Sequence, residues 1–176
     1  KAGRDFKNIP NLTYRESINE IKVNPLSHVP ENIEEITIDY SHIMKKVVRY
    51  ADPTGYQPFI DWYSYPVTAV FTCRGCTYSC KTCGGSAQTF RKMANRGKPA
   101  YRSPKLLAQD IFNISAHLHA PVMIIGDIFQ PGEEYGFVFL REMKRRLIAN
   151  HIAFEFFVPP STAQLERIAG SIPNFN

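Results

Sequence analysis

Three β-forming stretches alternate with three helical patterns between Pro66 and Gly170, and this order is the strongest constraint on the fold. Val67–Thr72 and Pro121–Gly126 are uninterrupted runs of β-type residues, as expected of strands that are covered on both faces. A third strand is predicted over Ala153–Val158. The order β-α-β-α-β-α predicts a parallel sheet with right-handed crossovers. The predicted fold class is therefore α/β.

Helix-capping residues support the helical patterns. Ser103 and Pro104 suit the N-cap and the first position of a helix. The next helix follows a Pro-Gly turn, with acidic residues at its start and basic residues at its end. Ser161 and Gln164 form a capping box for a last helix that ends at Gly170. Three βα units are thus predicted, and the third strand should have an unpaired edge unless further chain covers it.

The chain divides into a linker segment over residues 1–60 and the α/β region over residues 61–176. Residues 11–15 and 20–24 alternate as in a small β-hairpin. Apolar residues at helical spacing between Tyr40 and Val48 predict a helix. The α/β region is therefore expected to be preceded by a small linker with a hairpin and a helix.

The composition places the chain among globular proteins. Of its 176 residues, 44% are hydrophobic and 12% are aromatic. A chain of this length buries roughly two thirds of its surface and needs no disulfides to fold. It has no apolar run of about 18 residues, and its N-terminus lacks the apolar core of a signal peptide. We therefore expect no membrane partner. Four cysteines within eleven positions are not the disulfide framework of a secreted domain, so we expect a cytoplasmic protein.

One segment of the chain is strongly basic. The formal net charge is +5, yet no acidic residue lies between Trp62 and Gln109. A solvated surface is the default interpretation of such a segment, and partial neutralisation of a bound anionic group is the alternative. RNA binding is a weaker alternative, because Phe90 and Tyr101 form no aromatic ladder for base stacking. The eight cations of this window are Arg74, Lys81, Arg91, Lys92, Arg96, Lys98, Arg102 and Lys105.

All four cysteines lie in this basic segment, directly after the first predicted strand: Cys73, Cys76, Cys80 and Cys83. The last three have the spacing C-x-x-x-C-x-x-C. Three thiolates from one loop can hold three corners of a four-iron cluster and leave the fourth iron open. Zinc is the alternative, but zinc sites usually separate their C-x-x-C pairs by a dozen or more residues. We therefore favour iron–sulfur, with Cys73 outside the ligand set.

These features resemble the radical SAM superfamily in the motif, in its position after the first strand and in the βα repeats. The stretches IPNLTYRE, NPLSHVP, CRGCTYSCKTCGGS and IIGDIFQPGEEY are similar to the cobalamin-binding class of radical SAM proteins. The resemblance spans nearly the whole chain. It implies a partial (β/α) barrel of the radical SAM type, of which this chain would be the N-terminal half.

The resemblance also implies cofactors and an activity. Cys76, Cys80 and Cys83 would bind a 4Fe–4S cluster, and S-adenosylmethionine would chelate the open iron. One electron, from a reductant such as flavodoxin or ferredoxin, would cleave the sulfonium and give a 5′-deoxyadenosyl radical. Cobalamin-dependent methyl transfer would need a domain outside this chain, expected upstream of Lys1. Such chemistry belongs to the cofactors, while the protein supplies position and electrostatics.

Three further residues are implied as cofactor contacts. The family usually has an aromatic residue before the third cysteine, whereas this chain has Thr82, so the contact with the adenine must differ. Gly126 and Asp127 stand where the family holds the methionyl amino group. A glycine lets the backbone approach a ligand, and Asp127 could accept from an ammonium or have a structural role. For Glu155, near the third strand, we favour a structural role.

The sequence does not identify the substrate. The alternative function is a zinc-knuckle module that binds nucleic acid through the basic segment without catalysis.

Overall fold

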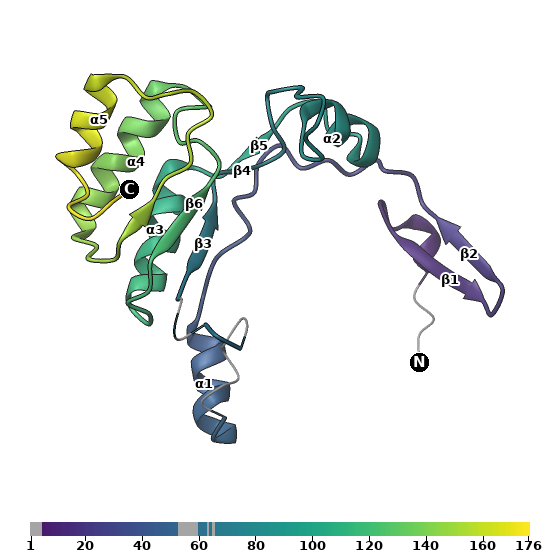
Figure 1. Cartoon of the computed structure of the whole chain (residues 1–176). Coiled ribbons are helices and arrows are strands. Elements are labelled where there is room, and N and C mark those ends of the chain that lie inside the picture. Colours follow the sequence, from purple (N-terminus) through teal and green to yellow (C-terminus); the bar gives the residue numbers. More distant parts are fainter. Residues whose placement is uncertain (1–4, 53–59, 63, 65) are drawn as a thin grey trace. The chain divides into compact units, whose positions relative to one another are not determined.

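The structure is a computed structural model that describes residues 5–52, 60–62, 64 and 66–176 (Figure 1). The chain forms two compact units. The first, which we call the cysteine unit, comprises Lys1–Asn32 and Gly75–Ala100. The second, which we call the sheet unit, comprises Ile33–Arg74 and Tyr101–Asn176. The predicted division at residue 60 stays a prediction.

The sheet unit is built on a parallel sheet with the strand order β3-β6-β7. Strand β3 (Thr68–Phe71) pairs with β6 (Val122–Ile125), and β6 pairs with β7 (Ile152–Ala153). Thr68 lies opposite Val122, and Val122 lies opposite Ile152. The predicted α/β class and its parallel sheet are thus confirmed. No barrel is seen in the described part of the chain.

The third strand is shorter than the sequence predicts. We expected Ala153–Val158, whereas β7 is limited to Ile152–Ala153. The reason is a competing contact, because the backbone N–H of Phe157 donates to the buried carboxylate of Asp127 at 3.1 Å. This bond holds the predicted second half of the strand in a loop.

The outer edge of β7 is paired, which corrects the expected free edge. The N–H of Ile152 donates to the carbonyl of Asn174 at 2.9 Å, and the N–H of Asn176 donates to the carbonyl of Ile152 at 3.1 Å. Ile152 and Phe175 form a parallel bridge. The chain after the last helix therefore covers this edge.

Three helices accompany the sheet: α3 (Pro104–Ser115), α4 (Glu133–Arg146) and α5 (Thr162–Ala169) (Figure 1). Their predicted starts are confirmed. The Ser103 hydroxyl accepts from the N–H of Leu106 at 3.3 Å. Ser161 and Gln164 form the predicted capping box. Local sequence therefore determines where these helices begin.

The hydrophobic core lies in the sheet unit. Gly136 shows how closely α4 packs, because a Cβ atom there would lie 2.3 Å from Cε1 of Phe129. This glycine leaves room for the aromatic ring. The core side chains come from the strands, the turn after β6 and the helices α3, α4 and α5. They include Val70, Leu107, Ile111, Ile114, Val122, Ile124, Ile128, Phe139, Leu140, Met143, Ile152 and Ile168.

Helix α1 (Ser41–Tyr50) also belongs to the sheet unit and confirms the helix predicted between Tyr40 and Val48. The carboxylate of Asp39 accepts from the N–H of Ser41 at 2.8 Å. The helix has no buried residue, and Ala51 ends it with a left-handed backbone, φ 49°. The helix therefore adds no buried side chain to the core of the sheet unit.

The cysteine unit contains short elements: η1 (Phe6–Asn8), β1 (Thr13–Ser17), β2 (Glu20–Val23) and α2 (Ala87–Ala94). Strands β1 and β2 form the predicted antiparallel hairpin. Helix α2 was not predicted. Strands β4 (Cys73–Arg74) and β5 (Ala100–Tyr101) lie where the chain passes between the units.

Over the described ranges, every helix is too short or too polar to cross a membrane.

Candidate metal and cofactor site

The segment that carries the cysteines, residues 72–102, begins and ends on the sheet unit, and we call it the excursion. The N–H of Thr72, just after β3, donates to the carbonyl of Ile125 at 3.1 Å. The carbonyl of Thr72 accepts from the N–H of Arg102 at 2.9 Å. The two ends of the excursion therefore meet at the carboxyl edge of the sheet, where α/β proteins commonly bind ligands.

Cys76, Cys80 and Cys83 all belong to the cysteine unit. Cys76 is partly buried, whereas Cys80 and Cys83 are exposed. The N–H of Tyr78 donates to Sγ of Cys76 at 3.4 Å, and the N–H of Gly85 donates to Sγ of Cys83 at 3.4 Å. Amide hydrogen bonds to a metal-bound sulfur tune the metal that it holds.

Backbone hydrogen bonds fold the cysteine loop onto the start of α2. The N–H of Cys83 donates to the carbonyl of Cys80 at 3.3 Å. The N–H of Ala87 donates to the carbonyl of Tyr78 at 2.7 Å. The Ser86 hydroxyl then accepts from the N–H of Thr89 as the N-cap of α2. Short-range contacts thus give the loop its shape.

The thiols fit an iron–sulfur cluster by the chemistry of the donors. They are soft ligands on one loop, and no carboxylate lies within residues 62–109 to compete with them. Among the residues that the structure describes, however, no three His, Cys, Asp or Glu side chains come together as a metal-binding group. The loop therefore supplies the donors but does not gather them into a site.

Cys73 differs from the other cysteines, because it belongs to the sheet unit. Its thiol is partly buried, and its Sγ lies 3.9 Å from Oε1 of Gln130. That Cys73 is not a ligand stays a prediction.

Thr82 and Gly126, two of the implied cofactor contacts, lie in different units. Thr82 is exposed in the cysteine unit. Gly126 is buried at the end of β6, and its N–H donates to the carboxylate of Glu155 at 2.9 Å. Its φ is 95°, and a Cβ atom added here would overlap with Oγ1 of Thr72. Both facts explain why a glycine occupies this position.

Asp127 is 5% exposed, and backbone groups use both of its oxygens. Oδ1 accepts from the N–H of Phe129 at 2.7 Å, and Oδ2 accepts from the N–H of Phe157 at 3.1 Å. Asp127 thereby joins the turn after β6 to the segment after β7. These contacts support a structural role. The carboxylate of Glu155 likewise holds a backbone group, in agreement with the role that we favoured for it.

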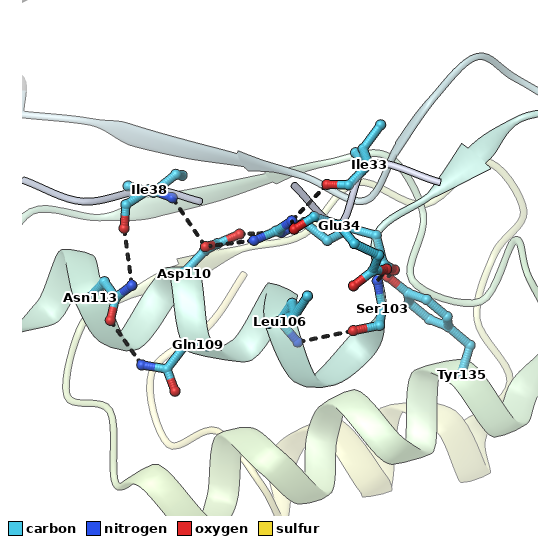
Figure 2. A network of polar contacts seen from close by, with 10 residues as sticks. Ile33, Glu34, Ile38, Ser103, Leu106, Gln109, Asp110, Asn113 and Tyr135 are labelled. Atoms are coloured by element: carbon cyan, nitrogen blue, oxygen red, sulfur yellow. Dashed lines mark hydrogen bonds and ion pairs between the residues drawn. The ribbon is translucent and has the colours of Figure 1, made fainter. Parts of the chain in front are cut away.

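A buried ion pair fixes the point where the excursion returns to the sheet unit (Figure 2). Arg102 is 2% exposed and donates through Nε and Nη2 to Asp110 on α3, the latter at 3.0 Å. Its Nη1 donates to the carbonyls of Ile33 at 2.7 Å and Glu34 at 3.2 Å. The pair joins residues only eight positions apart, but no pattern in the sequence indicates it, because the carbonyls that complete the contacts of Arg102 belong to the distant residues Ile33 and Glu34.

The segment of residues 33–38 is held along α3 by the same group of contacts (Figure 2). The N–H of Ile38 donates to Asp110 at 3.3 Å, and Asn113 donates to the carbonyl of Ile38 at 3.0 Å. The carboxylate of Glu34 accepts from the N–H of Ser103 at 2.6 Å. The segment therefore acts as a strap on the sheet unit.

Tyr135 completes this group of contacts from α4. Its hydroxyl donates to the carbonyl of Arg102 at 2.7 Å (Figure 2). Burial raises the pKa of the Tyr135 hydroxyl well above its ordinary value, and the nearby Cys73 and Glu34 add to this effect. The hydroxyl therefore stays a donor at neutral pH.

The eight cations of the basic window separate into two groups. Arg102 is buried in the ion pair, and Arg96 is 5% exposed and donates to the carbonyl of Pro30 at 2.8 Å. The other six are exposed, which agrees with the default interpretation of a solvated segment: Arg74, Lys81, Arg91, Lys92, Lys98 and Lys105.

The chain matches no protein-family model, and no curated protein or solved structure matches it significantly. The residues of the chain itself therefore carry the functional inference.

Proposed function

We propose that this chain is part of a radical SAM enzyme in which Cys76, Cys80 and Cys83 hold a 4Fe–4S cluster that binds S-adenosylmethionine. One observation carries the proposal. The C-x-x-x-C-x-x-C loop directly follows the first strand of a parallel α/β sheet, and its two ends meet at the carboxyl edge of that sheet. Ligand sites on parallel sheets are typically found at this edge.

The surroundings of the thiols support an iron–sulfur ligand set. Amide N–H groups already donate to Sγ of Cys76 and Cys83, and such bonds stabilise a sulfur that carries negative charge. Three exposed cations near the cysteines along the chain, Lys81, Arg91 and Lys92, have no acidic residue close to them in the sequence. The local environment is therefore suited to an anionic cluster.

When bound, these cofactors would supply a 5′-deoxyadenosyl radical by one-electron cleavage of the sulfonium. The chain would contribute three thiolates, and Gly126 would offer backbone without a side chain beside the cofactor. Thr82 and Asp127 are proposed as further contacts, although the hydrogen bonds of Asp127 favour its structural role. A partial barrel completed by further chain, cobalamin-dependent methyl transfer and a cytoplasmic location belong to the same proposal.

Anaerobic reconstitution with iron and sulfide tests the proposal. We expect bound iron, acid-labile sulfide and visible absorption in the wild-type chain. Cys80→Ala should abolish retention of the cluster, whereas the matched variant Cys73→Ala should keep it. Stoichiometric zinc without sulfide would overturn the proposal in favour of the zinc module. Equal behaviour of the two variants would overturn the ligand assignment.

A further inference from the structure

Helices α4 and α5 of the sheet unit lie side by side (Figure 1). A groove with two halves runs along them, one of about 290 Å³ and the other of about 380 Å³. Lys144, Gly170 and Ser171 line both halves, so the two halves are continuous. We call this surface the α4/α5 groove. All the residues that line it belong to the sheet unit.

The larger half of the groove is mostly apolar. Ile148 and Ile172 are buried there, and Ala169 and Pro173 line it as exposed residues. Lys144 is its charged residue. A contiguous apolar surface of this kind, with polar residues beside it, commonly marks a site where another protein binds.

Leu147, which also lines the larger half, is in an unfavourable position for a leucine. Its backbone is left-handed, with φ 51° and ψ 47°, a conformation that favours glycine at the end of a helix. Its side chain is 87% exposed, so the fold gains little from burying it. Neither the backbone nor the core of the sheet unit therefore explains this leucine, and a contact with another molecule would.

The smaller half of the groove has an excess of positive charge. Arg141, Lys144 and Arg167 are exposed there, against one acidic residue, Glu166. None of the four forms an ion pair with a residue that the structure describes. Arg167 instead lies over the ring of Phe137, with its Cζ 5.1 Å from the ring centroid.

Helix stability explains only part of this charge. Cations near the C-terminus of a helix interact favourably with its dipole, and Lys144 and Arg167 lie in the last turns of α4 and α5. Arg141 lies in the middle of α4, where this effect is absent. The exposed leucine beside these cations is not explained by the dipole either.

We infer that the α4/α5 groove is the docking site for a segment of a partner protein that carries both acidic and apolar side chains. Its apolar side chains would cover Leu147, and its acidic side chains would face Arg141. These two residues are six positions apart on α4, which corresponds to about 9 Å along the helix axis. Amphipathic segments bind apolar grooves in this way, and complementary charge fixes their orientation. The inference does not depend on the proposed function.

A second copy of this chain is a less suitable occupant. Its helix α1 is exposed and has an apolar side, but its charged residues are Lys45, Lys46 and Arg49. Like charges would repel this helix from the groove. The charge of the groove therefore favours an acidic partner.

The experiment measures binding of fluorescein-labelled peptides to the whole chain by fluorescence anisotropy. The probe is a peptide that repeats leucine and glutamate at helical spacing, and the matched probe has glutamine in place of each glutamate. We expect the glutamate probe to bind and to lose affinity as salt is raised. The glutamine probe should bind about tenfold more weakly, because it lacks the complementary charge.

Leu147→Gly is the decisive variant, because its two expected effects differ in sign. Affinity for the glutamate probe should fall about tenfold, since the apolar contact is lost. The midpoint of thermal unfolding should not fall, since glycine suits the left-handed backbone. Arg141→Glu should also weaken binding about tenfold, by repulsion. The matched control is Lys105→Glu, at an exposed cation on α3 outside the groove, which should change affinity less than about twofold.

Three results would overturn the docking site: no binding of the glutamate probe, equal binding of both probes, or an unchanged affinity in Leu147→Gly. Sedimentation of the whole chain tests the other occupant. A wild-type dimer that Leu147→Gly converts to a monomer would assign the groove to self-association and overturn the partner segment.

Discussion

Each of the two units of this chain is stabilised internally by a different kind of contact. The sheet unit has an apolar core between its strands and helices. In the described part of the cysteine unit, Ala100 is the buried apolar residue, and the other buried residues are Asn24, Ser86 and Arg96. Asn24 donates to the carbonyls of Phe6 and Ile9, both at 2.7 Å. Apolar burial therefore stabilises the sheet unit, whereas side-chain contacts with the backbone hold the cysteine unit.

This difference determines where a bound metal would matter. A typical hydrogen bond contributes only about 1 kcal/mol to net stability, so a unit without a core is marginal. Metal binding by thiolates adds directly to the folding free energy of the segment that supplies them. The cysteine unit is therefore the part of the chain that a cluster would stabilise.

Arg102→Met should give the largest loss of stability. The substitution leaves the charge of Asp110 buried without its partner, which costs about 3–5 kcal/mol in free energy of unfolding. Urea denaturation followed by circular dichroism measures the loss. Arg91→Met, at an exposed cation of the cysteine unit, is the control and should change stability by less than about 0.5 kcal/mol. Similar losses for both would contradict the contrast.

Gly126→Ala should destabilise the sheet unit through the backbone. A positive φ costs an ordinary residue about 1–3 kcal/mol, and the overlap of the new Cβ atom with Oγ1 of Thr72 adds to this. Thermal melts should show a lower midpoint for Gly126→Ala. A second substitution, Thr72→Ala, should restore part of this loss by removing the overlap. Gly84→Ala in the cysteine unit is the control, since its Cβ atom would meet nothing within 4 Å. An unchanged midpoint for Gly126→Ala would refute this account.

Two equivalent helix caps should respond differently in the two units. Ser86 and Ser103 each accept from the third residue of their helix at 3.3 Å. Loss of such a cap costs about 1 kcal/mol. Ser103→Ala should lower the urea midpoint, whereas Ser86→Ala should only speed hydrogen exchange of α2 amides. If Ser86→Ala shifts the urea midpoint as much as Ser103→Ala does, the units unfold together.

The smallest effect concerns alkaline pH. Burial raises the pKa of Tyr135, so the folded state keeps a proton that the unfolded chain loses above about pH 10. This part of the stability is fully present below pH 10 and is lost as the pH rises towards the folded pKa. Stability measured against pH should therefore fall less steeply in Tyr135→Phe than in the wild-type chain. Identical slopes would show that Tyr135 has no such role.

Local signals predicted much of the sheet unit. The apolar runs gave β3 and β6, and hydroxyl caps marked the starts of α3 and α5. The third strand was overestimated because Phe154, Phe156 and Phe157 have the β propensity of a longer strand. A contact between Phe157 and Asp127, distant in sequence, decided the outcome.

The features that the sequence does not indicate are a short helix and contacts between residues far apart in the chain. Helix α2 is only eight residues long and has no buried residue, so it lacks the long apolar pattern by which a helix is recognised in the sequence. The strap over residues 33–38 reaches Arg102 from about seventy positions away, which no local pattern indicates. For the candidate site, the spacing of the cysteines identified the donors. Only the structure shows that the cysteine donors belong to one unit, whereas Gly126 and Asp127 belong to the other.

The hydrogen bond between Thr72 and Arg102 has a consequence for how this architecture tolerates change. It joins the two ends of the cysteine-bearing excursion at 2.9 Å, entirely within the sheet unit. The entropic penalty of closing a loop rises only with the logarithm of its length. Insertions and deletions between these two residues should therefore disturb the sheet unit little. The sequence of the excursion is then free to diverge while that of the sheet unit stays constant.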